Sequence, residues 1–92
     1  MQVHVIREEN HGLIGIAATY RAAMYWLLSS GWVGRYSEIW IPDEDDCNGG
    51  RNMTLDELFG DNWEKQFIRF SYGALENMGF YIRKEDVIEE ED

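Results

Sequence analysis

The chain is poor in the residues from which disulfide frameworks and many active sites are built: its 92 residues include one cysteine, one proline and two histidines. The lone Cys47 excludes an internal disulfide. The N-terminal segment has neither a basic start nor an apolar run long enough for export, so the sequence predicts a cytoplasmic protein. No run approaches the ~20 apolar residues that a membrane span needs, and an interaction with membranes is not expected.

Basic residues are also scarce, with 8 lysines and arginines against 18 aspartates and glutamates, for a formal net charge of −10. They do not form the basic stripe of a nucleic-acid-binding protein, so direct binding to nucleic acid is not expected. Residues 1–42 carry three acids and three bases, whereas residues 43–92 carry the other fifteen acids and five bases. A surface with such an excess repels nucleic acid and membranes and attracts basic protein surfaces.

Motifs that mark catalytic and cofactor sites are missing as well. Cys47 follows a run of four carboxylates, residues 43–46, and such neighbours disfavour the reactive thiolate. The same run fails as a calcium loop, because with Gly49 at the sixth position the twelfth is Leu55, where a bidentate glutamate is required. The glycines nowhere form a phosphate-binding motif. The sequence therefore predicts no catalytic residue, no metal and no cofactor.

The stretch from residue 19 to residue 31 carries the clearest structural signal. Thr19 is a suitable N-cap and Gly31 a suitable left-handed C-cap for a helix. About three turns of helix bury little surface alone, so this helix needs a sheet to pack against. Its apolar residues have the spacing of a helix that buries one face: Tyr20, Ala23, Met24, Leu27 and Leu28.

Short apolar runs predict the strands of that sheet. Residues 2–7 and 13–17 form a hairpin around a polar turn, residues 37–41 form a third strand that Pro42 ends, and residues 80–83 form the last strand. The chain is therefore expected to be a single small α+β domain over residues 1–92. Its mainly antiparallel sheet would have about four strands, with helices packed on one face.

The second half of the chain combines acidic segments with short helices. Residues 42–52 are expected to be an acidic loop and residues 85–92 an acidic C-terminal tail. Thr54 and Glu57 have capping-box spacing before a short helix that Gly60 ends.

Asp61 and Glu64 repeat the same helix-start signal seven residues later. Beyond them, helix and strand patterns overlap over residues 66–72. The preceding caps favour a helix to about residue 70, followed by a second short helix over residues 71–77.

The clustered acids suggest a function. Carboxylates spaced along one face of a small rigid domain can replace a phosphate backbone, since proteins that bind nucleic acid recognise this backbone mainly as negative charge. An inhibitor of this kind occupies the basic channel of a nuclease and needs no catalytic residue. Neighbouring tryptophans would add contacts that charge alone does not supply. The predicted partner-binding residues are Asp43, Glu44, Asp45, Asp46, Asp56, Glu57, Asp61, Glu64, Trp40 and Trp63.

In its size, in the acids of the segment PDEDDCNGG and in the tail VIEEED, the chain resembles the small acidic proteins that phages encode against host nucleases, the antirestriction and anti-CRISPR inhibitors. The resemblance implies binding to a nuclease or CRISPR effector complex in the host cytoplasm, without a cofactor. Three hypotheses compete with it. The chain is a non-inhibitory interaction module, such as a homodimer formed through exposed aromatic residues, or it is a small enzyme or metal protein. In the third, its acids only keep a small aromatic-rich domain in solution.

Overall fold

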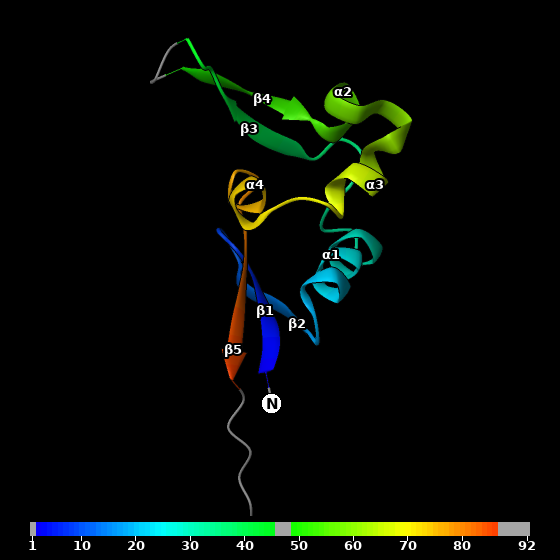
Figure 1. Ribbon diagram of the computed structural model, residues 1–92, viewed down its shortest axis with the longest axis vertical. Helices are drawn as coiled ribbons and strands as arrows, with labels where there is room; N and C mark the ends of the chain where they lie inside the picture. The colour runs from blue at the N-terminus through cyan, green and yellow to red at the C-terminus, as the bar shows by residue number, and fades with distance from the viewer. Residues whose placement is uncertain (1, 46–48, 87–92) are drawn as a thin grey trace, which may run out of the picture.

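The computed structural model describes residues 2–45 and 49–86. A pair of strands, a ten-residue helix, a second pair of strands, a run of short helices and a last strand follow one another along this part of the chain (Figure 1). In chain order the elements are β1 (Gln2–Glu8), β2 (Gly12–Ala17), α1 (Tyr20–Ser29), β3 (Glu38–Pro42), β4 (Gly50–Thr54), α2 (Leu55–Phe59), the 3₁₀ turn η1 (Gly60–Asn62), α3 (Trp63–Phe67), α4 (Tyr72–Glu76) and β5 (Phe80–Asp86).

The strands form two antiparallel sheets, which confirms the α+β class predicted from the sequence. One sheet has three strands in the order β2-β1-β5, and the other is the β3–β4 hairpin. The five strands thus differ from the expected single sheet of about four. The difference arises because residues 50–52, which the sequence assigned to the acidic loop, pair with β3 instead; Gly50 lies opposite Pro42.

Helix α1 packs against the three-stranded sheet as its apolar spacing predicts. The Thr19 hydroxyl accepts a hydrogen bond from the Ala22 backbone N–H at 3.0 Å, and Gly31 has the positive φ of +85° that follows many helix ends. Met24 and Leu27 are fully buried, and Tyr20 and Leu28 are partly buried against the core. The predicted helix, its cap and its buried face are confirmed.

One hydrophobic cluster joins the three-stranded sheet to the helices of the second half. Sheet residues contribute Ile6 and Ile82, while the later helices contribute Leu55, Phe67 and Leu75. Each of these three helical residues lies in a five-residue helix, which is too short to be stable alone. The short helices therefore depend on this shared core.

The helix boundaries after residue 54 agree only in part with the sequence. The capping box of Thr54 and Glu57 is present, and Gly60 ends α2. The prediction that Asp61 caps the next helix is wrong: α3 begins after Asn62, without a side-chain cap. Asp61 lies in η1, and its carboxylate instead accepts a hydrogen bond from Arg35 Nη2 at 2.6 Å.

The remaining elements settle the ambiguous region. Helix α3 ends at Phe67, earlier than predicted, and no strand forms among residues 66–72. The Ser71 hydroxyl caps α4, accepting from the Ala74 N–H at 3.3 Å, as its position predicts. Strand β5 is longer than expected because it pairs along all of β1; Asp86 lies opposite Gln2. Residues 85 and 86 therefore belong to a strand and not to the expected tail.

Candidate protein-binding surface

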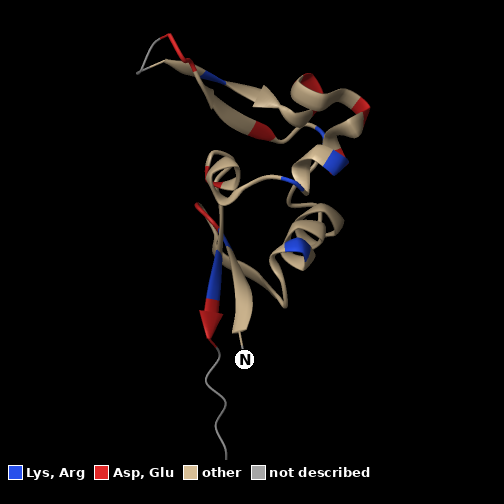
Figure 2. Ribbon diagram, in the orientation of Figure 1, with Lys and Arg blue, Asp and Glu red and all other residues tan. Residues whose placement is uncertain are grey.

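The β3–β4 hairpin presents part of the predicted acidic surface at its end. Cross-strand pairs run from Glu38 and Thr54 to Pro42 and Gly50, and the acids follow directly after β3. The Asp43 N–H donates to the Gly49 carbonyl at 3.0 Å, and the Asp45 N–H donates to Asp43 Oδ1, also at 3.0 Å. We call residues 43–45 the acidic tip; Figure 2 shows it at the far end of the hairpin.

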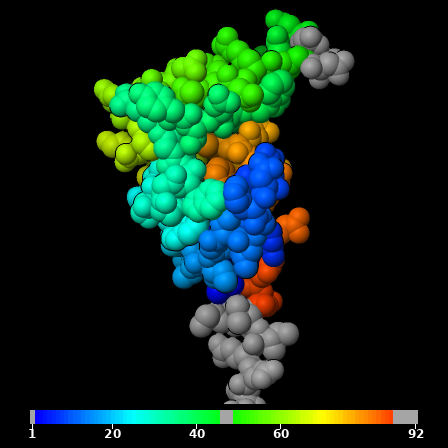
Figure 3. Space-filling model, turned by 180° about the vertical axis from the view of Figure 1, so that it is seen from behind, coloured from blue at the N-terminus to red at the C-terminus, as the bar shows by residue number. Residues whose placement is uncertain are grey.

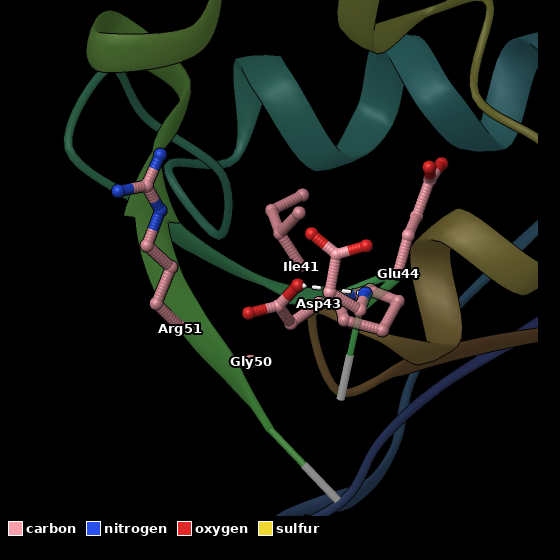
Figure 4. A pocket seen from close by; sticks show the side chains of 7 residues that line it. Ile41, Asp43, Glu44, Gly50 and Arg51 are labelled. Carbon is pink, nitrogen blue, oxygen red and sulfur yellow. Dashed lines mark hydrogen bonds between the residues drawn. The ribbon is translucent and has the colours of Figure 1, made fainter. Parts of the chain in front are cut away.

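The carboxylates of the acidic tip are exposed, and within the described residues none of them forms an ion pair. With Ile41, Pro42, Gly50 and Arg51 they line a depression of about 450 Å³. Arg51 is the one base of this lining, and Figure 4 shows its guanidinium directed away from Asp43. The acidic tip therefore carries negative charge that no ion pair among the described residues offsets.

Trp40 lies on the same hairpin and is 40% exposed. Its ring lies across Gly50: a Cβ atom at that position would stand 2.3 Å from Trp40 Cζ2. Its backbone N–H donates to the Asn77 carbonyl at 3.1 Å, which ties β3 to the end of α4. The hairpin thus holds a tryptophan in a fixed place beside the acids, as a contact residue requires.

The acids of α2 and η1 form a second group, which Figure 2 shows beyond the end of the hairpin opposite to the acidic tip. Most of these acids have structural partners. Arg35 donates to Asp56 through Nε and to Asp61 through Nη2. Asp56, followed by Asp61, raises the pKa of the Arg35 guanidinium above its ordinary value. Glu57 Oε1 accepts from the Thr54 N–H at 3.2 Å, and Glu64 is exposed on α3.

Arg35 is the residue that sequence analysis missed. It stands 21 residues before Asp56 and 26 before Asp61, so no local pattern connects them. Because the guanidinium offsets one of the three negative charges of Asp56, Glu57 and Asp61, this group presents less net charge than its number of acids suggests.

Trp63 is partly buried at the start of α3 and not on the hairpin. It lines a groove of about 340 Å³ between α1 and α3, together with Tyr25, Leu28 and Ile68. The structure therefore places the two predicted contact tryptophans on separate elements, one beside the acidic tip and one in this groove.

Some predicted acids lie outside the described residues, namely Asp46 and the tail from residue 87 onward. Just before that tail, in β5, Glu85 Oε1 accepts a hydrogen bond from Arg7 Nη1 at 3.1 Å across the sheet. Figure 2 shows the end of β5 remote from the hairpin. The last acids of β5, Glu85 and Asp86, and the acidic tip thus lie on separate surfaces.

Within residues 2–45 and 49–86, no group of three or more histidine, cysteine, aspartate or glutamate side chains could hold a metal ion. None of the helices described has the length and apolar character needed to cross a membrane. No protein-family model matches the chain, and neither curated proteins nor solved structures gave a match.

Proposed function

We propose that the protein is an inhibitor that binds a basic surface of another protein, and that this surface belongs to a nuclease or CRISPR effector in the host cytoplasm. One observation carries the proposal: the β3–β4 hairpin places three exposed carboxylates, none of them in an ion pair with another described residue, beside a tryptophan held across Gly50. The charges would direct the encounter with a positive patch, and the ring would supply buried contact area.

Charge on the acidic tip should act mainly on the association rate. Exposed charges of opposite sign accelerate encounter and are screened beyond about 10 Å at 0.1 M salt. Binding should therefore weaken steeply with ionic strength, while the contact of Trp40 is much less sensitive to salt. A partner whose basic channel normally holds a phosphate backbone fits both features.

The first experiment is a pull-down from bacterial lysate with the tagged protein at low and high salt, followed by mass spectrometric identification. We expect capture of a nucleic-acid-binding enzyme that elutes with salt and whose cleavage activity falls when the protein is added. Failure to recover such an enzyme from any host tested, or capture without inhibition, would argue against the inhibitor.

The decisive variant is the triple change Asp43→Asn, Glu44→Gln and Asp45→Asn. It should lower the association rate by at least tenfold and flatten its salt dependence. A matched control removes three exposed carboxylates elsewhere: Glu9→Gln, Glu76→Gln and Asp86→Asn. An equal loss in both variants would mean that net charge, and not the hairpin, drives binding.

A self-associating module remains a second candidate, which the outer face of the three-stranded sheet favours. This face exposes apolar side chains, with Leu13 at 58%, Ile16 at 59% and Tyr81 at 37%. Their cross-strand pairs with Val5 and Arg7 place them together. A dimer held by this face should dissociate in sedimentation experiments when Leu13 and Ile16 are replaced by serine. A wild-type protein that stays monomeric at high concentration would exclude it.

A further inference from the structure

A third hollow lies at the junction of four segments: the β1–β2 turn, the connection after α1, the start of β3 and the residues that lead into β5. Figure 3 shows the turn (blue) reaching up beside α4 (orange), below the green layer of the hairpin. The hollow has a volume of about 240 Å³. We call it the Trp32 pocket; it is lined by Trp32, Met78, Phe80, Glu8, His11, Ser37 and Glu38.

The anionic wall of the Trp32 pocket is preorganised. The Glu8 side chain is only 12% exposed, and its Oε2 accepts hydrogen bonds from the Asn10 N–H, at 3.2 Å, and from His11 Nδ1. Its Oε1 has only a long contact of 3.5 Å, to Asn10 Nδ2, and so keeps acceptor capacity. The hydrogen bond from His11 lowers the pKa of the Glu8 carboxyl, so Glu8 itself is ionised at neutral pH. Glu38 adds an exposed carboxylate.

The apolar wall is a fixed aromatic surface. The His11 and Trp32 rings form a T-shaped pair, with centroids 5.2 Å apart and planes at 71°. On the core side, Phe80 packs against the same ring with planes at 85°. Met78, which is partly buried, completes the wall with a polarisable side chain. A planar cation entering the pocket would therefore meet both an aromatic surface and carboxylates.

We propose that the Trp32 pocket receives an arginine side chain of the basic partner, an inference that rests on the proposed function. A guanidinium stacks on tryptophan, presents a planar fork of N–H donors to a carboxylate, and is less strongly hydrated than a lysine ammonium. None of the lining residues is a lysine or arginine. His11 is the only lining group that can carry positive charge, and its Nδ1 is engaged by Glu8.

The test uses a small probe and no partner protein. N-acetyl-arginine amide is titrated into the labelled protein at low salt, and chemical shifts are followed by NMR. We expect saturable shifts at the Trp32 indole N–H and at the backbone of Glu38. The uncharged isostere N-acetyl-citrulline amide should cause none, and the lysine analogue should bind at least fivefold more weakly. Equal shifts with citrulline, or shifts centred on the acidic tip, would overturn the proposal.

Glu38→Gln is the matching variant, because this exposed side chain can change without loss of packing. It should weaken binding of the arginine probe about tenfold, while the control Glu76→Gln leaves it unchanged. The same variant should also reduce capture of the partner. Probe binding that survives in Glu38→Gln, or unaltered capture, contradicts the assignment. A pocket that binds the probe while no partner is ever recovered would refute the inhibitor function instead, so the two failures are distinguishable.

Discussion

Replacing Gly50 by alanine tests whether the hairpin holds Trp40 as the structure shows. The new Cβ would stand 2.3 Å from Trp40 Cζ2 and 2.7 Å from the backbone oxygen of Ile41. Carbon atoms in good contact are about 3.5–4.0 Å apart, so the ring must withdraw by more than an ångström and the backbone must shift. Such overpacking typically costs about 1–3 kcal/mol, partly offset by about 0.4–1 kcal/mol from the lower entropy of the unfolded chain.

The net loss of about 1–2 kcal/mol should lower Tm by roughly 5–15 °C for a domain of this size. Thermal unfolding followed by circular dichroism measures the loss, and tryptophan emission should shift to the red as Trp40 moves into solvent. Gly34→Ala is the matched control, since no atom lies within 4 Å of its Cβ position and its φ is ordinary. If both variants melt within about 2 °C of the wild type, Trp40 does not rest on Gly50, and its role as a fixed contact residue fails with it.

Three further changes probe single interactions. Thr54→Ala should destabilise the protein by about 1 kcal/mol in urea unfolding, because it removes the capping box of α2; an unchanged midpoint would contradict this. Tyr20→Phe should cost about 0.5–1.5 kcal/mol in the same assay, since the hydroxyl donates to the Phe70 carbonyl at 2.5 Å; a gain in stability would refute it. The hydrogen bond from His11 is the main reason why the pKa of Glu8 in the folded protein lies below the ordinary 4.5. The ionised Glu8 therefore stabilises the fold above pH 4.5, and this stabilisation is lost as the pH falls through the pKa of the folded protein. Glu8→Gln should therefore lose less stability than the wild type in acid melts, and parallel curves would exclude the interaction.

The features predicted correctly depend on signals within a few residues. Thr19 caps α1 through Ala22, and Thr54 and Glu57 form their box within four consecutive positions. The buried residues of α1 recur with the period of an α-helix, so their spacing in the sequence is enough to predict the buried face. These elements need no knowledge of the rest of the fold.

The features that were missed depend on contacts between separate elements of the fold. Strand β4, with the sequence GRNMT, has little of the apolar alternation that marks a strand and forms because β3 lies opposite. Residues 85 and 86 join β5 because β1 extends beside them. Asp61 fails as a cap because Arg35, 26 residues earlier, binds its carboxylate. Strand pairing and ion pairs between separate elements of one chain leave no periodic pattern in its sequence.

The predicted acidic residues also differ in how much of their charge is available for binding, which the sequence does not reveal. Arg35 pairs with Asp56 and Asp61, and Glu57 is held by a helix cap. The acidic tip has no such partner among the described residues. A basic partner therefore gains most by approaching the hairpin, where no existing ion pair has to be broken. The Trp32 pocket includes Glu38, the first residue of β3, and the acidic tip follows the last residue of β3, so a surface aligned along this strand would face both proposed sites.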